Sequence, residues 1–388
     1  MTDPRETMTP ASTDLAAAAG PMRIELAPVR NQWWDVWDQF RRHRGAMIGA
    51  AFFIFILLFA YVGPQVWRVD PGYLNIQARG TSQMIACFGV GGAARDSVAA
   101  YEAAIAAGGA VQDNPPRRLG VGGYFGAMTG CFADPEGFSA AFEPFKDRRI
   151  KVSWAHPLGT DQKGTDTLAW LMSGGQTSIS VGLTAMLLSI LIGTLVGVVA
   201  GYFKRLDGIL MRMTDLFLAL PLLPLLLVMV MLFRQSLSSA FGPETGIFIL
   251  IVVAIGVTSW MPTARIVRGD VLALKEHEFV LAARSIGTRP GRIIRRHIIP
   301  NVMSPIMVAA TLGIANAIIT ESALSFLGLG FPSDYPSWGR LLNDGVQFMQ
   351  QNPERVLWPG LAISLTVLSV NYMGDGLRDA LDPRIRGQ

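Results

Sequence analysis

Six apolar segments separated by polar stretches dominate this chain, and most are long enough to cross a lipid bilayer. A helix needs roughly 20 apolar residues to span the hydrocarbon core. The hydrophobic share of the 388 residues is 51% and the charged share is 16%, whereas soluble proteins contain about 25% charged residues. We therefore expect an all-α membrane protein with six transmembrane helices. The segments run over 45–66, 176–202, 210–233, 246–267, 302–320 and 356–373.

Lysine and arginine gather beside certain ends of these segments and predict which side of the membrane each end faces. They lie before the first segment, between the second and third, and between the fourth and fifth, where seven occur from Arg268 to Arg296. Such clusters mark the cytoplasmic side. With six spans, both termini then lie in the cytoplasm. The residues beside the first three segments are Arg41, Arg42, Arg44, Lys204, Arg205 and Arg212.

Residues 1–44 read as a cytoplasmic tail that ends in a helix at the membrane surface. The tail lacks a basic stretch followed directly by an apolar one, so we expect no cleaved signal peptide and targeting by a retained span. Within NQWWDVWDQFRRHRG, a helix places Trp33, Trp37 and Phe40 on one face. That pattern predicts an interfacial helix. A docking surface for a neighbouring subunit is an alternative that does not exclude the first.

A long insert, residues 67–170, separates the first two spans. Long loops cross the membrane largely regardless of charge, and alternation of the spans places this one outside. An alanine run flanked by glycines predicts a helix, and NPPRRLGVGG predicts turns. The aromatic content favours a small folded extracytoplasmic subdomain over a disordered linker. These aromatic residues are Tyr73, Phe88, Tyr124, Phe125, Phe132, Phe142 and Phe145.

Both cysteines of the chain, Cys87 and Cys131, lie in this insert. Two cysteines and four scattered histidines exclude a disulfide framework and predict no metal cluster. In a compartment that permits oxidation, a pair within one small subdomain favours a disulfide. Two buried free thiols are the alternative.

A basic, polar segment, EFVLAARSIGTRPGRIIRRHIIPN at 278–301, interrupts the apolar second half. Phe279, Ala283 and Ile286 follow at i, i+4 and i+7, with Ala282 beside them, which predicts a short amphipathic helix with a narrow face of small and apolar groups. Alanine pairs let the backbone of a partner approach closely. We therefore expect this face to be a docking surface.

The rest of that segment predicts a sharp corner between two helices. Gly287 is suited to end the first helix because glycine adopts positive φ readily. Thr288 and Pro290 suit the cap and first turn of a second helix, and Pro300 closes it near the membrane. A protruding helix, a corner and another helix are suited to transmitting a partner's movement into the bundle.

This segment resembles the EAA loop of ABC importer permeases. Its Ala-Ala, Gly and Ile-x-Pro positions are Ala282, Ala283, Gly287, Ile298 and Pro300. Leu281 replaces the glutamate that usually precedes the alanines, and Glu278 is the nearest acidic residue. The stretches HPLGTDQKGTDTLAWLMSGGQTSISVGL, ESALSFLGLG, PSWGRLL and NYMGDGLRDALDPRIR are similar to C-type permeases of dipeptide and oligopeptide importers. The resemblance covers most of 150–388 and the basic first span.

The resemblance implies a type I ABC importer permease in a bacterial inner membrane, with five helices in 171–388 and a coupling loop at 268–301. Implied partners are a B-type permease, two cytoplasmic ATP-binding subunits, an extracytoplasmic solute-binding protein and lipid, with no nucleic acid. ATP and Mg²⁺ belong to the ATP-binding subunits, and this chain is a transport subunit with no cofactor or catalytic residue of its own. The implied ATPase-coupling residues are Glu278, Phe279, Ala282, Ala283, Arg284, Gly287, His297 and Pro300.

Other functional classes fit the sequence less well. The chain contains no GxxxxGK[ST] phosphate-binding motif, so it does not supply the P-loop for ATP hydrolysis. A secondary transporter would need ion-coupling charges and repeated broken helices, which are not evident. A membrane hydrolase would need a nucleophile with partners inside the spans. A related importer for nickel or another small solute remains the closest alternative.

Several residues within the spans predict structural roles. Asp215 and Glu321 lie near expected membrane boundaries, where capping or bonding between helices accounts for them better than a functional site. Pro221 and Pro224 predict a kink in the third span. The small-residue pattern of the second span suits close helix packing, either within the chain or between subunits. Its glycines are Gly193, Gly197 and Gly201.

Overall fold

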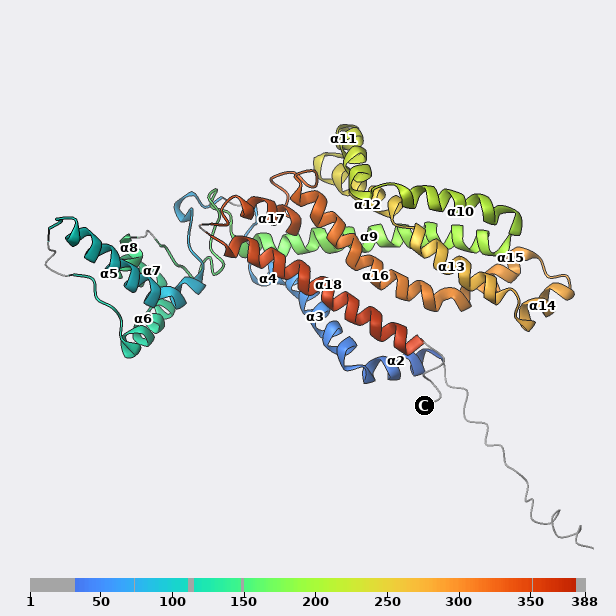
Figure 1. Ribbon diagram of the computed structural model, residues 1–388, viewed down its shortest axis with the longest axis horizontal. Coiled ribbons are helices and arrows are strands. Elements are labelled where there is room, and N and C mark those ends of the chain that lie inside the picture. Colours follow the sequence, from blue (N-terminus) through green and yellow to red (C-terminus); the bar gives the residue numbers. More distant parts are fainter. Residues whose placement is uncertain (1–31, 73, 111–114, 148–149, 351, 382–388) are drawn as a thin grey trace, which may run out of the picture.

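A bundle of long helices forms the body of the protein in the computed structural model, which describes residues 32–72, 74–110, 115–147, 150–350 and 352–381 (Figure 1). Within these described ranges, five helices are long and apolar enough to cross a membrane, or six if a pair bent by 42° counts as one span. The expected all-α membrane fold is thus confirmed. The helices of the bundle are α3 (Arg44–Tyr61), α9 (Thr167–Tyr202), α10 (Lys204–Ala219), α11 (Leu222–Phe241), α12 (Pro243–Thr258), α13 (Met261–Leu274), α16 (Ile299–Phe326) and α18 (Glu354–Leu381).

The third and fourth predicted spans are not continuous helices, which corrects the sequence-based expectation. Helix α10 ends at Ala219 and α11 begins at Leu222. Pro221, between them, has no backbone N–H to continue the helical hydrogen bonds, so the predicted kink is a full break. The fourth span breaks between α12 and α13, at Ser259 and Trp260. The two breaks lie near one another, because the rings of Phe217 and Trp260 meet edge to face at 6.2 Å.

Helices α9 and α13 pack with almost no space between their backbones. A Cβ atom at Gly193 would lie 2.7 Å from the carbonyl oxygen of Trp260. One at Gly197 would lie 2.7 Å from the carbonyl oxygen of Ala264, and one at Gly201 would lie 2.7 Å from Cβ of Val271. The three glycines therefore serve packing within the chain, which is one of the two uses that the sequence left open.

Glu321 bonds helices to one another, as the sequence predicted. Its side chain is fully buried in α16. The hydroxyl of Ser178, on α9, donates to Oε2 at 2.7 Å, and the hydroxyl of Ser325 donates to Oε1 at 2.7 Å. The Ser178 hydroxyl in turn accepts from the backbone N–H of Trp338 at 3.3 Å, at the start of α17 (Trp338–Val346). One carboxyl group thus joins three helices.

The N-terminal helix α2 (Gln32–Arg42) divides its apolar residues between two faces. Val36 is buried and, with Phe40, packs against the end of α18. Trp34 and Trp37 are 64% and 48% exposed. Part of the predicted aromatic face therefore contacts this chain, and the exposed part keeps the interfacial location a prediction. The Trp33 side chain and residues 1–31 lie outside the described part of the chain.

The insert between α3 and α9 contains a folded helical unit beyond one end of the bundle (Figure 1). In its core, Cys87 and Cys131 pack with Phe145 and Val152, and all four side chains are almost inaccessible to solvent. The two sulfur atoms form a disulfide, with the Cα atoms 5.7 Å apart. The predicted alanine-rich helix is α5. Helix α5 spans Val90–Ala106, and the other α-helices among the described residues of the insert are α6 (Val121–Ala133), α7 (Pro135–Ala141) and α8 (Glu143–Asp147).

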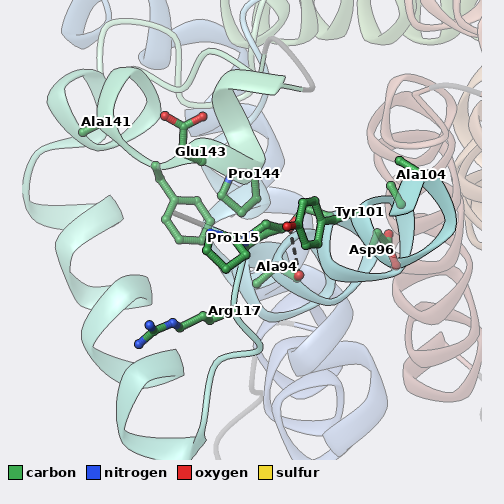
Figure 2. A pocket seen from close by; sticks show the side chains of 13 residues that line it. Ala94, Asp96, Tyr101, Ala104, Pro115, Arg117, Ala141, Glu143 and Pro144 are labelled. Carbon is green, nitrogen blue, oxygen red and sulfur yellow. Dashed lines mark hydrogen bonds between the residues drawn. The ribbon is translucent and has the colours of Figure 1, made fainter. Parts of the chain in front are cut away.

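An open cavity of about 960 Å³ lies within the insert, between α5 and the segments at 115–117 and 141–144 (Figure 2). Tyr101 of α5, Pro115, Arg117 and Glu143 are among the residues that line it. Proline, alanine and aromatic side chains supply most of its wall.

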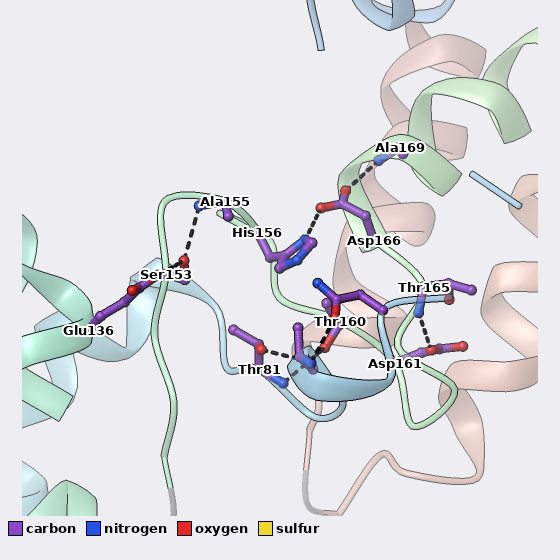
Figure 3. A network of polar contacts seen from close by, with 12 residues as sticks. Thr81, Glu136, Ser153, Ala155, His156, Thr160, Asp161, Thr165, Asp166 and Ala169 are labelled. Atoms are coloured by element: carbon purple, nitrogen blue, oxygen red, sulfur yellow. Dashed lines mark hydrogen bonds and ion pairs between the residues drawn. The ribbon is translucent and has the colours of Figure 1, made fainter. Parts of the chain in front are cut away.

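The segment 156–166 fastens the insert to the bundle (Figure 3). The Asp166 carboxylate accepts from the Ala169 N–H at 2.8 Å and so caps α9, and its other oxygen lies 2.6 Å from His156 Nδ1. Arg355 of α18 donates to the Thr160 carbonyl at 2.9 Å. Gly164 has φ +92°, and a Cβ there would collide with the Asn75 carbonyl. Polar bonds and a glycine turn thus connect the insert to α9 and α18.

The disulfide gives a direct chemical prediction. In protein isolated without reductant, peptides containing Cys87 and Cys131 are expected to be linked. The crosslink closes a loop with a sequence separation of 44, and chain entropy then stabilises the insert by about 3 to 4 kcal/mol. Peptide mapping with and without reductant measures the linkage. Alkylation of both thiols in native, unreduced protein would contradict it.

Candidate coupling site

The basic segment forms a helical corner at the end of the bundle opposite the insert (Figure 1). It contains α14 (Glu278–Ser285) and α15 (Pro290–Ile293). Gly287 has φ +76°, and its N–H donates to the Arg284 carbonyl at 2.9 Å, while the Thr288 N–H donates to the Ala283 carbonyl at 3.1 Å. This bonding pattern ends a helix through a residue of positive φ. The predicted helix, corner and second helix are thus present.

One face of α14 is buried within the chain itself. Val280 is fully buried and Ala283 is 8% exposed. They pack in a core with Ile293, Ile298 and Val302. The expectation that Ala283 lies on an exposed docking face is therefore wrong, because the small side chain admits the neighbouring helices of this chain. Ala283 positions α14 and does not face solvent.

The opposite face of α14 and the corner are exposed. Ile286 is 82% exposed and Leu281 is 42% exposed. Ala282, Gly287 and Glu278 are exposed too. Glu278 lies in the first turn of α14, where a carboxylate is favoured by the helix dipole. The free surface is therefore built on large apolar residues at a glycine corner, more than on paired alanines.

Aromatic and helix-breaking residues shape the other side of the corner. The Phe279 ring lies 5.7 Å from the His277 ring and 6.1 Å from the His297 ring, between centroids. A π-helical turn, Ile294–Ile298, precedes α16. Pro300 contributes to this irregularity because it has no N–H to offer the carbonyl four residues earlier. His297 and Pro300 thus join the corner to α16.

Three contacts that the sequence analysis missed join the corner and the end of α13 to α9 and α10. The Arg284 guanidinium lies over the Tyr202 ring at 5.2 Å. Lys275 Nζ donates to the Gly201 carbonyl at 3.3 Å. Arg268 binds Asp207 of α10 with two hydrogen bonds, of 2.5 and 2.7 Å. Arg284 therefore joins α14 directly to α9, and the other two contacts join α13 to α9 and α10.

Comparisons with known proteins agree with this geometry. Residues 189–387 match the family described as binding-protein-dependent transport system inner membrane component. Residues 31–82 match the N-terminal TM domain of oligopeptide transport permease C. A multi-span helical bundle that matches these descriptions is a membrane transport component. The chain belongs to the binding-protein-dependent transport system inner membrane component family, which confirms the resemblance inferred from its motifs.

Named relatives are about 40% identical to this chain over the aligned residues. The dipeptide transport system permease protein DppC of Bacillus subtilis is 40% identical over 263 residues, covering 67% of this chain and 78% of its own. The protein of the same name from Alkalihalophilus pseudofirmus is 40% identical over 232 residues, covering 60% and 73%. Inward-facing conformations of the MetNI methionine ABC transporter align with a TM-score of 0.45 and 18% identity, covering 56% of this chain and 99% of that chain.

Proposed function

We propose that this chain is a permease subunit of an ATP-driven importer for dipeptides or oligopeptides. It forms half of the translocation path together with a second, B-type permease. The observation that carries the proposal is the exposed corner around Ile286, next to a helix face that Val280 buries against the bundle. The relatives of this chain are named dipeptide transport system permease proteins. A rigid helix with a free apolar face is the structure that a soluble motor subunit needs.

The proposed orientation places this corner in the cytoplasm. The basic residues beside it support that side by the positive-inside rule, and the insert, at the other end of the bundle, then lies outside the membrane. Both termini are cytoplasmic in a bacterial inner membrane. Two ATP-binding subunits, which hold ATP and Mg²⁺, dock on the coupling corners of the two permeases. An extracytoplasmic solute-binding protein delivers the peptide to the outer side.

Reconstitution tests the proposal. The chain is co-expressed with a B-type permease and ATP-binding subunits, purified, and placed in proteoliposomes with the solute-binding protein and a labelled dipeptide. We expect peptide uptake that requires ATP and every subunit. Uptake by this chain alone, without an ATP-hydrolysing subunit, would overturn the mechanism. Import of nickel or another solute with no peptide uptake would overturn the substrate class.

A further inference from the structure

An ion pair occupies an exposed position on the flank of the bundle. Arg265 Nη2 of α13 donates to Asp215 Oδ1 of α10 at 2.5 Å, and the two side chains are 52% and 61% exposed. The glycine contacts place α13 along the last ten residues of α9, with Thr263 against Gly193 and Ala264 against Gly197, so Arg265, the next residue along α13, lies at the level of these glycines. At 1.5 Å per residue this is about 10 Å inside the end of α9 at Tyr202.

Helix α10 has a buried side and an exposed apolar stripe, and Asp215 lies on neither. Thr214 is fully buried toward the bundle. Ile209, Met213 and Leu216 recur at i, i+4 and i+7 and are 62%, 48% and 64% exposed, as a lipid-facing stripe would be. At 3.6 residues per turn, Asp215 lies about 130° around the helix from this stripe. Its side of α10 also carries Arg212 and Leu218, which are both exposed.

Water is the environment that suits such a pair. A charged side chain in hydrocarbon is energetically unfavourable, so charged residues at membrane depth face a bundle interior or a water-filled cavity. The neighbouring Asp207–Arg268 pair shows the contrast, since its side chains are only 22% and 32% exposed and form two hydrogen bonds. The Asp207–Arg268 pair already joins α10 to α13. The more exposed Asp215–Arg265 pair is therefore available for another role.

Apolar and irregular structure adjoins the exposed pair. Phe217, two residues beyond Asp215, meets Trp260, five residues before Arg265, ring to ring. Both helices break nearby, at Pro221 and at Ser259. Binding sites of membrane transporters are typically formed where helices are interrupted, because unwound backbone is tolerated only where it lines a cavity or is covered by protein.

We propose that Asp215 and Arg265 line the translocation path and bind the charged termini of a peptide. Arg265 takes the α-carboxylate, which matches the geometry of a guanidinium, and Asp215 takes the α-ammonium. The ion pair opens to admit a zwitterion and closes again when the peptide leaves, so neither state leaves an unpaired charge. This inference rests on the proposed function and adds the part of the peptide that is recognised.

Cysteine accessibility tests the location. In the assembled transporter in lipid nanodiscs, Asp215→Cys is treated with a membrane-impermeant thiosulfonate, and Leu216→Cys, which is 64% exposed on the same helix, is the matched control. The two native cysteines form a disulfide and do not react. We expect labelling at position 215 to be faster by about tenfold or more, because lipid excludes a charged reagent from position 216. Equal rates, or an unreactive position 215, would overturn the location.

Peptides with blocked ends test the recognition. For Asp215→Cys, in which Arg265 remains, a dipeptide with a free carboxylate is expected to slow the labelling, and its C-terminal amide is not. For Arg265→Cys, with Ile266→Cys as control, the free dipeptide protects and its N-acetyl derivative does not. Equal protection by blocked and free peptides would overturn terminus binding. Absence of peptide uptake by the unaltered transporter would instead refute the proposed function, without changing the labelling contrast between positions 215 and 216.

Discussion

Replacement of Gly197 by leucine is expected to destabilise the bundle strongly. The first added carbon would lie 2.7 Å from the carbonyl oxygen of Ala264 and 2.8 Å from Cβ of Val267. Neither neighbour is the flexible end of a side chain, so α9 and α13 must separate. Overpacking typically costs about 1 to 3 kcal/mol, and a contact that involves backbone belongs at the upper end. Thermal unfolding and the yield of monodisperse protein measure the effect.

Gly208→Leu provides the matched control for that experiment. Gly208 lies in helix α10, and a Cβ atom there would meet nothing within 4 Å. Both substitutions replace a helical glycine by the same better helix former, which by itself favours the helix by up to about 1 kcal/mol. The difference between the variants therefore isolates the packing against α13. Equal unfolding temperatures would show that the two helices are not packed as described.

The six spans follow from the sequence because their length and apolar content are local properties. Their interruptions do not. Hydropathy averaged over 210–233 shows one apolar segment, yet the chain breaks at Pro221, and a proline inside a membrane helix produces either a bend or a break according to its neighbours. The second break, at Ser259, has Pro262 nearby but lies before it. Tertiary packing decides both outcomes.

The coupling corner shows the same limit. Gly287 and Pro290 predict the corner from local backbone chemistry, and the structure agrees. A stripe of apolar residues, however, does not indicate whether this chain or a partner covers it. For that reason the sequence predicts an exposed docking face at Ala283, whereas the side chain is buried within this chain. The Asp207–Arg268 pair joins residues 61 positions apart, so no spacing pattern in the sequence indicates it.

Replacement of Ile286 by arginine is expected to uncouple transport without loss of the protein. In the isolated chain this side chain is 82% exposed, so the substitution has little effect on folding. A buried apolar anchor at an interface is often worth about 2 kcal/mol or more, which is more than tenfold in affinity. Peptide uptake and ligand-stimulated ATPase activity are therefore expected to fall by about tenfold or more, with less ATP-binding subunit recovered in co-purification.

The comparison with Ala283→Arg separates docking from folding. Ala283 lies 8% exposed against the fully buried Val280, and a guanidinium inserted there is left without a charged partner in an apolar core. That variant is expected to lose yield and thermal stability together with transport, so its loss of transport says nothing about the ATPase. If Ile286→Arg instead binds the ATP-binding subunits and imports peptide like the unaltered chain, the exposed corner is not the docking surface. If Ile286→Arg no longer binds the ATP-binding subunits but keeps normal stability, these subunits contact the corner. The buried face of α14 then transmits their movement to α9 and α13.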